Sequence, residues 1–367
     1  MKRIRVAIIG QGRSGRDIHG AYLSQDTRRF EIAAAVDPVR ERRERAAAEY
    51  GCETYRSHEP LLRRDDLGLI VNAAPSHLHV TVSLQFLRAG FNVLSEKPLA
   101  SKAKEVDLLI SASKKAGKVL AIFQQSRYAP YFQQVREVID SGVLGEIVQI
   151  SIAFSGFSRR YDWQTLTECN GGNLLNTGPH PLDQALQLFG TDTMPQVACF
   201  MRNAVSYGDA EDHVVLILTG EGRPLINLEI SSCCAYPSFT YHVYGTLGGL
   251  KGSTSEMKWR YYLPREAPKL RLRRTPLSKP DGTPSYCTDS LKWHVRKWRI
   301  PESKGNMFAV MSGAFYRMLY RTLTTGTPLD ITPEQVRQQI AVIEECQRQN
   351  PGIYGRRRGA FRRSASG

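Results

Sequence analysis

Residues 3–15 read RIRVAIIGQGRSG, a β-branched apolar run that passes directly into a glycine-rich turn. In such a turn Gly10 permits the tight bend, Gly12 lets the backbone approach a pyrophosphate, and Gly15 allows the following helix to pack closely on the strand. The positive end of that helix then faces the phosphates. The stretch predicts a dinucleotide-binding βα turn, although a glycine-rich turn without a ligand has the same pattern.

An acidic residue ends the next strand. The expected strand Phe30–Val36 is followed by Asp37, 22 residues beyond Gly15. A carboxylate at this position can accept both ribose hydroxyls of an adenosine and repels a 2′-phosphate, so NAD is favoured over NADP. Arg40 and Arg42 leave a pairing with a 2′-phosphate open, but a solvated basic helix face is the simpler interpretation.

The first 125 residues alternate short apolar runs with stretches of helical length. Strands are expected at Arg3–Ile9, Phe30–Val36, Leu69–Ala73, Asn92–Ser95 and Val119–Phe123, and helices at Arg40–Tyr50, His77–Ala89 and Lys104–Lys115. This alternation requires crossover connections and gives a parallel sheet with helices on both faces. We therefore expect a doubly wound Rossmann domain over residues 1–125.

Beyond residue 125, strands follow one another more directly, as in an antiparallel sheet with one covered face. Strands are expected at Ile147–Phe154, Val197–Ala204, His213–Thr219, Leu225–Ser231 and Tyr241–Tyr244, and helices at Tyr131–Asp140, Asn176–Phe189, Met307–Leu323 and Pro333–Arg348. The class is therefore α/β, with a second domain over residues 126–350.

The net charge of +15 is concentrated in two segments. Residues 258–304 hold 13 cations and 4 anions, giving +9, and residues 351–367 add +5 and are expected to form a flexible tail. Because the remainder is nearly neutral, a surface coated for nucleic acid is not indicated. The basic, aromatic segment 256–304 permits an arm to a neighbouring subunit, a loop over the substrate, a cationic edge or a single-stranded nucleic-acid surface; we favour the first two.

The cellular setting is inferred from apolar runs and cysteines. No apolar run reaches the roughly 20 residues that span a bilayer, and the apolar core of the first ten residues is too short for a secretory signal. Seven cysteines without a CxxC pair favour reduced thiols and no metal site. We expect a cytoplasmic protein without a membrane segment.

Lys97 is the first candidate for chemistry. It stands in Ser95-Glu96-Lys97-Pro98, at the end of the expected strand Asn92–Ser95. In a doubly wound sheet this edge faces the ligand crevice, where a cation can hydrogen-bond a substrate hydroxyl and stabilise the developing alkoxide. A surface lysine in a proline-terminated turn is the alternative.

His180 is the second candidate, in the stretch GGNLLNTGPHPLD at residues 171–183. If one helix runs from Asn176, then His180 and Asp183 lie at i+4 and i+7 on the same face. A histidine with a pKa near neutrality suits proton exchange with a hydroxyl group. A buried packing histidine is the alternative.

Taken in order, these motifs resemble the Gfo/Idh/MocA oxidoreductases, named from glucose-fructose oxidoreductase, inositol dehydrogenase and a rhizopine-catabolism protein. The resemblance rests on GQGRSG at 10–15, Asp37, AAPSHLH at 73–79, SEKPLA at 95–100, RYAPYFQQVREVIDSGVLGEI at 127–147, GGNLLNTGPHPLD at 171–183 and GTPLDITPEQVRQQIAVIEE at 326–345. It covers most of the chain apart from residues 256–304 and the tail.

The resemblance implies a Rossmann domain, an α/β domain with an open, mostly antiparallel sheet, and NAD(P)-dependent oxidation or reduction of a sugar, cyclitol or related polyol. Members commonly associate through the open sheet, so a homodimer or homotetramer is implied. Lys97 and His180 match the catalytic pair. Cofactor positions are Gly10, Gly12, Arg13, Ser14, Gly15, Asp37, Ala74, Pro75, His79, Glu96, Lys97 and Gln125, and substrate positions are Asn176, Asp183 and Arg127. The alternative for Asp183 is that it orients His180 or its helix.

Two positions depart from the family pattern. Asn176 stands where the family usually has Asp, and an amide can position a hydroxyl but cannot accept its proton. Gln125 stands where many members have Asn near the nicotinamide, which keeps an amide on a longer arm. Proton abstraction must therefore rest on His180 or Lys97.

The resulting hypothesis is that a substrate hydroxyl bonds Lys97 and His180, that His180 takes its proton, and that hydride passes to nicotinamide. Two alternatives stay open. One is a redox-neutral NAD-dependent enzyme that cleaves glycosidic bonds through transient oxidation. The other is a non-enzymatic NAD-binding regulatory protein, against which Lys97 and His180 argue.

Overall fold

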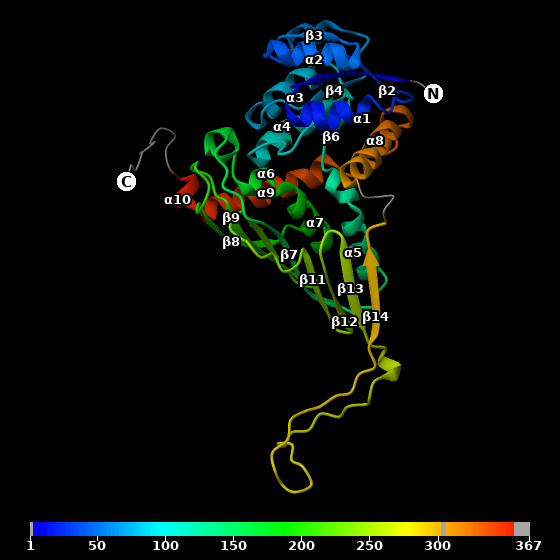
Figure 1. Ribbon diagram of the computed structural model, residues 1–367, viewed down its shortest axis with the longest axis vertical. Coiled ribbons are helices and arrows are strands. Elements are labelled where there is room, and N and C mark those ends of the chain that lie inside the picture. Colours follow the sequence, from blue (N-terminus) through cyan, green and yellow to red (C-terminus); the bar gives the residue numbers. More distant parts are fainter. Residues whose placement is uncertain (1–2, 302–305, 356–367) are drawn as a thin grey trace.

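The computed structural model describes residues 3–301 and 306–355. It contains a six-stranded and an eight-stranded sheet, which lie one above the other along the long axis of the molecule (Figure 1). The predicted α/β class is confirmed, with a parallel sheet first and a mostly antiparallel sheet second. Within these residues no helix has the length and apolar character needed to cross a membrane. Most of the expected tail, residues 356–367, lies outside the described residues.

The first sheet has the strand order β3-β2-β1-β4-β5-β6, and all neighbouring strands are parallel. Its strands are β1 (Ile4–Ile9), β2 (Phe30–Val36), β3 (Glu53–Tyr55), β4 (Leu69–Asn72), β5 (Val93–Ser95) and β6 (Leu120–Ile122). The short β3 was not predicted. The order reverses between β1 and β4, so the carboxyl ends of these strands border the position where doubly wound sheets bind ligands.

Helices cover both faces of this sheet, as the alternating sequence pattern requires. They are a π-helical segment, Ser14–Gly20, which runs into α1 (Ala21–Leu23), and α2 (Arg40–Tyr50), α3 (His79–Arg88) and α4 (Ala103–Ala116). Helix α2 ends at Gly51 and α4 at Gly117, both in the left-handed conformation that glycine adopts without strain.

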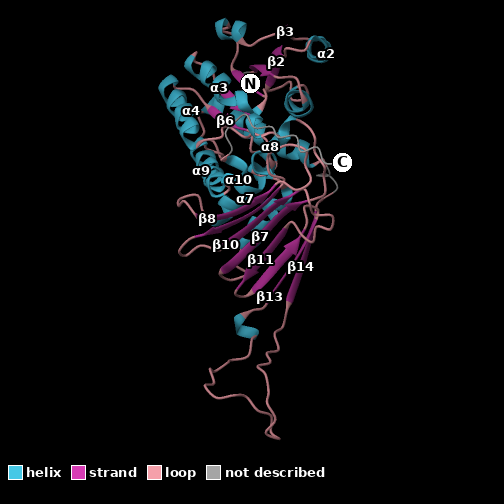
Figure 2. Ribbon diagram, turned by 90° about the vertical axis from the view of Figure 1, so that its left-hand side faces the viewer, coloured by secondary structure: helices cyan, strands magenta, loops and turns pink. Residues whose placement is uncertain are grey.

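The second sheet has the order β14-β13-β12-β11-β7-β10-β9-β8, with β7 and β10 parallel and the other neighbours antiparallel. Its strands are β7 (Ile147–Ser155), β8 (Gln196–Arg202), β9 (His213–Thr219), β10 (Leu225–Ser231), β11 (Tyr241–Gly245), β12 (Gly248–Gly252), β13 (Glu256–Tyr261) and β14 (His294–Arg299). Burial alternates along β9, so one face is covered. Figure 2 shows the helices on that one side of the sheet.

The helices of the second half are α5 (Pro130–Asp140), α6 (Asn173–Asn176), α7 (Pro179–Phe189), α8 (Met307–Thr325), α9 (Pro333–Gln349) and α10 (Pro351–Tyr354). The prediction of one helix over Asn176–Phe189 is wrong, because Thr177 and Gly178 separate α6 from α7. Residues 351–354 form α10 and are helical, although they were expected to belong to a flexible tail.

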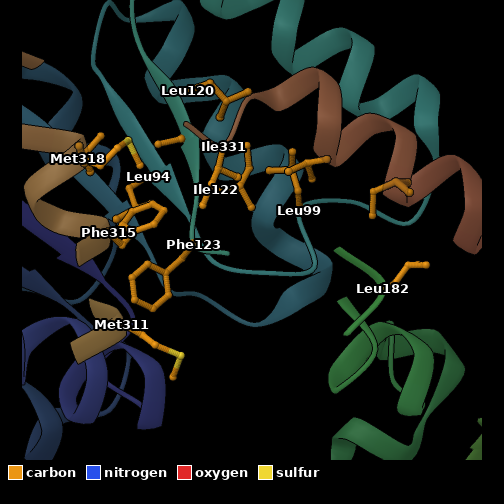
Figure 3. Packing of buried hydrophobic residues seen from close by; sticks show 14 of the residues in the cluster. Leu94, Leu99, Leu120, Ile122, Phe123, Leu182, Met311, Phe315, Met318 and Ile331 are labelled. Atoms are coloured by element: carbon orange, nitrogen blue, oxygen red, sulfur yellow. The ribbon is translucent and has the colours of Figure 1, made fainter. Parts of the chain in front are cut away.

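Helix α8 returns to the first domain. Its Tyr316 stacks on Tyr22 with ring centroids 4.8 Å apart, and its Phe315 packs edge-on against Phe123 at 4.9 Å. Figure 3 shows Phe123 and Phe315 beside the end of β6, with Leu182 of α7 on the far side of the same view. These side chains belong to one hydrophobic cluster that reaches both sheets, so the two domains share a packed core.

Residues 262–293 form an arm between β13 and β14. Figures 1 and 2 show the arm beyond the end of the second sheet that is farthest from the first domain. The predicted insertion 256–304 is thus not one segment, since its ends pair as two strands of the sheet; residues 302–304 lie outside the described residues. The interpretation of a loop over this chain's own substrate site is wrong, because the arm extends away from the first domain.

Candidate functional site

The glycine-rich turn follows β1 at the switch point of the first sheet. A Cβ on Gly10 would overlap the carbonyl oxygen of Ala73, and a Cβ on Gly15 would overlap the carbonyl oxygen of Gly10. A Cβ on Gly12 would meet no atom within 4 Å. Gly10 and Gly15 are therefore required by packing, whereas Gly12 leaves open space in front of the turn that a dinucleotide phosphate fits.

Asp37 is fixed at the end of β2. Only 2% of the residue is exposed, and its carboxylate accepts from the backbone N–H groups of Gln11 at 2.8 Å and Val39 at 2.9 Å. Arg42 lies 3.5 Å from the same carboxylate, whereas Arg40 pairs with Glu44. Since a carboxylate has about four acceptor positions, Asp37 keeps capacity for ribose hydroxyls.

Gln11 and Gln125, which follow strands at the carboxyl edge of the first sheet, each have a buried side-chain atom without a protein partner among the described residues. These atoms are the amide nitrogen Nε2 of Gln11, inside the glycine-rich turn, and the carbonyl oxygen Oε1 of Gln125, just beyond β6. Buried polar atoms usually have a partner, and an unpaired one costs about 1–3 kcal/mol. Together with the space at Gly12, this donor and this acceptor fit a bound dinucleotide.

His79 links the two loops that border the crevice. Its Nε2 lies 2.8 Å from the carbonyl oxygen of Ala74, and its Nδ1 lies 2.7 Å from that of Pro98. A neutral imidazole has one N–H group and cannot donate to both. Burial lowers the pKa of His79, although both carbonyl groups and Glu96 favour the charged form. His79 thus positions the loop before Pro75 against the turn that carries Lys97.

Lys97 follows β5 and reaches across the domain junction. Its Nζ donates to the backbone carbonyl oxygen of Asn176 at 2.6 Å. Burial lowers the pKa of the Lys97 ammonium, and the charges of Arg13 and Arg160 lower it further, while Glu96 acts in the opposite direction. A lysine with a lowered pKa exchanges protons closer to neutral pH than an exposed lysine does.

Glu96 is buried beside Lys97. Its Oε1 lies 3.1 Å from His19 Nε2, and its Oε2 accepts from the Lys97 backbone N–H at 3.0 Å. Burial acts to raise the pKa of Glu96, but the His19 bond and the charges of His19, Lys97 and His79 outweigh it and lower the pKa to about 2. The other ring nitrogen of His19 lies 2.7 Å from Tyr316 Oη. The row Tyr316, His19 and Glu96 therefore fixes the turn that carries Lys97.

His180 lies in the first turn of α7, on the second-domain side of the crevice. Its Nδ1 is 3.1 Å from Ser126 Oγ. Burial lowers the pKa of His180 to about 3, and the charge of Lys97 contributes, while Glu96 opposes the shift. The imidazole is therefore neutral at physiological pH. Lys97 of the first domain bonds to the backbone oxygen of Asn176, four residues before His180, so the lysine reaches the segment that carries the histidine.

Asn176 ends α6 and faces Lys97 with its backbone rather than its amide. Its side-chain Oδ1 accepts from Gln164 Nε2 at 3.4 Å. Because α6 and α7 are separate helices, Asn176 and His180 do not form the single helical stripe that the sequence suggested. The two residues still belong to neighbouring segments of the second domain.

Arg127 and Asp183 pair with each other. The two oxygens of Asp183 accept from Arg127 at 2.5 and 3.0 Å, and both side chains are buried. Arg127 also donates to the backbone oxygen of Asp330 at 3.0 Å and to Gln335 at 2.6 Å. Both side chains are thus engaged with each other, and the expectation that they hold substrate hydroxyls stays a prediction. They join the segment after β6 to α7 and to the start of α9.

Sequence reasoning missed several residues that complete the site, namely His19, Ser126, Arg160, Gln164 and Tyr316. Ser126 was the most accessible to sequence reasoning, since it lies between two residues that were selected. The others are distant from the motifs along the chain and carry no periodic or spacing signal. Their contribution depends on tertiary contacts.

Profile comparison matches residues 4–124 to the NAD-binding Rossmann fold of an oxidoreductase family and residues 132–251 to the GFO/IDH/MocA C-terminal domain. An uncharacterized oxidoreductase of Schizosaccharomyces pombe is 26% identical over 94% of this chain and 96% of its own length. D-glucoside 3-dehydrogenase of Escherichia coli is 30% identical over 53% of this chain and 56% of its own. The WlbA dehydrogenase of Bordetella pertussis, solved with NADH and UDP-GlcNAcA, is similar in fold, with a TM-score of 0.77, 20% identity and 96% coverage of both chains.

Proposed function

Because the chain belongs to the GFO/IDH/MocA family of NAD-binding oxidoreductases, we propose that it transfers hydride between NAD and a hydroxyl-bearing carbon of a sugar, cyclitol or related polyol. One observation carries this proposal: Lys97 of the first domain donates from its Nζ to the backbone oxygen of Asn176 at 2.6 Å, and Asn176 stands four residues before His180 in the second domain. The sugar and cyclitol class is supported by relatives named D-glucoside 3-dehydrogenase and scyllo-inositol 2-dehydrogenase.

The proposed roles follow from the charge of each group. Bound NAD supplies the hydride acceptor at the carboxyl edge of the first sheet. Lys97 donates a hydrogen bond to the substrate hydroxyl and stabilises the negative charge that develops on its oxygen. His180 is neutral and accepts the hydroxyl proton, although its lowered pKa makes it a weaker base than the histidine of near-neutral pKa that the sequence suggested. If its Nδ1–H donates to Ser126, the free Nε2 is the proton acceptor.

The nicotinamide cofactor we propose is NAD rather than NADP. The carboxylate of Asp37 lies at the end of β2, where it would accept from ribose hydroxyls and repel a 2′-phosphate. Arg42 is near but faces this carboxylate, which compensates its charge. Comparing kcat/KM for NAD and NADP tests this part, and a preference for NADP would contradict it.

The enzymatic proposal is tested by following NADH formation over a panel of sugars, inositols and sugar acids. Lys97→Ala is expected to lower kcat by about 100- to 10,000-fold while NAD still binds. Lys114→Ala is the matched control, since Lys114 lies on the surface of α4 and pairs with Glu334. Full turnover by Lys97→Ala would contradict the role of the lysine, and turnover of no polyol by the wild type would contradict the function.

We further propose that a second copy of the chain covers the open face of the second sheet. Phe200 on β8 is 67% exposed, its cross-strand neighbour Val215 and Ile217 on β9 lie on the same uncovered face, and Tyr244 lies exposed on β11. Exposed apolar patches of this kind are typical of association surfaces. Light scattering of wild type and Phe200→Glu tests this, and a monomeric wild type would contradict it.

A further inference from the structure

A row of hydrogen bonds connects Lys97 to an arginine of the second domain. Lys97 Nζ donates to the backbone oxygen of Asn176 at 2.6 Å, and Asn176 Oδ1 accepts from Gln164 Nε2 at 3.4 Å. Gln164 Oε1 in turn accepts from Nη2 of Arg160. Arg160 therefore belongs to the same row of hydrogen bonds as the Lys97 ammonium, with Asn176 and Gln164 between them.

The charges around Lys97 are predominantly positive. Arg160 and Arg13 both act on the Lys97 ammonium, and both lower its pKa. The opposing acid, Glu96, is already engaged by His19 and by a backbone N–H group. Like charges gathered in one crevice repel one another unless an anion joins them.

The two arginines differ in what can neutralise them. Arg13 belongs to the glycine-rich turn of the first domain, where the phosphates of the dinucleotide provide negative charge. Arg160 belongs to the loop after β7 in the second domain. Its carboxylate partner Asp162 lies 2.7 Å from Nη2, but the side chain of Asp162 is 48% exposed, so water weakens that pair.

Arg160 keeps donors for a further group. Within the described part of the chain, its bonds to acceptors use Nη2 alone, and Nε and Nη1 donate to no protein atom. The side chain of Arg160 is 28% exposed, so it is partly open to solvent. Nε and Nη1 lie on different edges of the guanidinium, so each can donate a separate charge-assisted hydrogen bond to an oxygen of a carboxylate or phosphate.

We propose that the substrate carries an anionic group, a carboxylate or a phosphate, which Arg160 binds while the reacting hydroxyl lies against Lys97. This inference rests on the proposed dehydrogenase function and specifies its substrate class. A neutral polyol would leave the Arg160 donors to water and the positive charge of the crevice uncompensated. An acidic or phosphorylated sugar would accept hydrogen bonds from Arg160 and compensate the positive charge.

The test compares matched substrates that differ only in the anionic group. Glucose, glucuronate and glucose 6-phosphate are assayed with NAD, so that the comparison separates a carboxylate from a phosphate. The variants are Arg160→Gln and, as a control, Arg159→Gln. Arg159 is the neighbouring arginine, which lies over the Tyr207 ring at 5.4 Å.

Arg160→Gln is expected to lower kcat/KM for the preferred anionic substrate by roughly 10- to 100-fold, the usual effect of removing a charged hydrogen bond. For the neutral analogue the change is expected to stay within about 3-fold. Arg160→Lys is expected to restore part of the loss, because it restores the positive charge but not the planar set of guanidinium donors. Equal losses for neutral and anionic substrates, or no loss for either, would overturn the inference.

A binding measurement separates this inference from the dehydrogenase function. The melting temperature of the wild type with NAD is expected to rise with the anionic member of a pair more than with the neutral one, and Arg160→Gln is expected to abolish the difference. If this pattern appears without NADH formation, the dehydrogenase proposal fails and the anion site stands. If turnover occurs with neutral sugars alone and no anion shifts the melting temperature, the anion site fails and the dehydrogenase proposal stands.

Discussion

The ammonium of Lys97, on the first domain, lies 2.6 Å from the backbone carbonyl oxygen of Asn176, on the second. This bond orients the lysine but leaves two of its three N–H donors for other partners. The acceptor is a backbone atom at the end of α6, so the bond does not require a particular side chain at residue 176. The replacement of the family's Asp by Asn thus leaves the anchor of the lysine intact.

The pH dependence of kcat/KM is expected to reflect Lys97 on the alkaline side. Its pKa is lowered from 10.5, so activity that requires the ammonium should fall as pH rises through a value below 10.5. Arg160→Gln removes one nearby positive charge, and the alkaline limb should then move to higher pH. A profile in which this substitution moves the limb downward, or leaves it in place, would contradict the electrostatic account.

On the acid side, the pH profile of kcat/KM should show no inflection near pH 6.5. The pKa of His180 is lowered to about 3, so the free enzyme keeps a neutral imidazole down to about pH 4. An inflection between pH 6 and 7 in kcat/KM that disappears in His180→Asn would show that the histidine is far less shielded than its burial indicates. Ser126→Ala serves as a comparison, since it removes the Nδ1 partner without removing the ring.

Gly12 and Gly15 are expected to respond differently to the same added methyl group. A Cβ on Gly12 meets no protein atom within 4 Å, so Gly12→Ala should keep the melting temperature and weaken NAD binding by roughly 10-fold or more. A Cβ on Gly15 overlaps the backbone of Gly10, so Gly15→Ala should lower the melting temperature even without NAD. Thermal unfolding and calorimetric titration with NAD separate the two effects. Unchanged NAD affinity in Gly12→Ala would exclude the turn as a phosphate site.

Much of the fold could be predicted because it rests on local patterns. The ranges of β2, β9, β10 and α2 agree with prediction to the residue. Runs of β-branched residues predict the strands, and a glycine after the last helical residue predicts the end of the helix. The break between α6 and α7 was missed because Gly178 stands inside an otherwise helical pattern. The glycine-containing strand β12 and the basic strands β13 and β14 were missed because their apolar residues are few.

The site was predictable at its motif residues but not in its connections. Lys97 and His180 could be selected from strand ends and side-chain chemistry, whereas the row from Tyr316 through His19 to Glu96 joins residues almost 300 positions apart. The pairing of Arg127 with Asp183 was also inaccessible, because each looked suitable for a sugar hydroxyl when considered alone. Tertiary packing decides which polar groups remain free for a ligand.

Asp183→Asn tests whether the Arg127 pair is structural. Removing one charge from a buried ion pair typically costs about 3–5 kcal/mol, because the other charge is left uncompensated. Arg127 keeps its bonds to Asp330 and Gln335, so the lower end of this range is expected. Urea unfolding should show the loss. If the free energy of unfolding is unchanged while KM rises, the residues bind substrate as the sequence first suggested.

Glu211 is expected to make stability depend on pH through the helix that anchors Lys97. Its carboxyl group is buried, accepts from the Leu174 backbone N–H at 2.8 Å at the start of α6, and accepts from the Tyr354 hydroxyl of α10. Burial raises the pKa of Glu211 from 4.5 to about 7, with a contribution from Asp212 and opposition from its hydrogen bonds. The folded chain then holds this proton more tightly than the unfolded chain. The free energy of unfolding should therefore fall by up to about 3 kcal/mol as pH rises from 4.5 to 7, and stay low at higher pH.

The variant Glu211→Gln should remove this slope. Compared with the wild type in urea unfolding, the variant should gain stability at pH 8 relative to pH 5. The exposed Glu146→Gln is the control, and an equal slope in wild type and Glu211→Gln would show that the carboxyl group is ionised without cost.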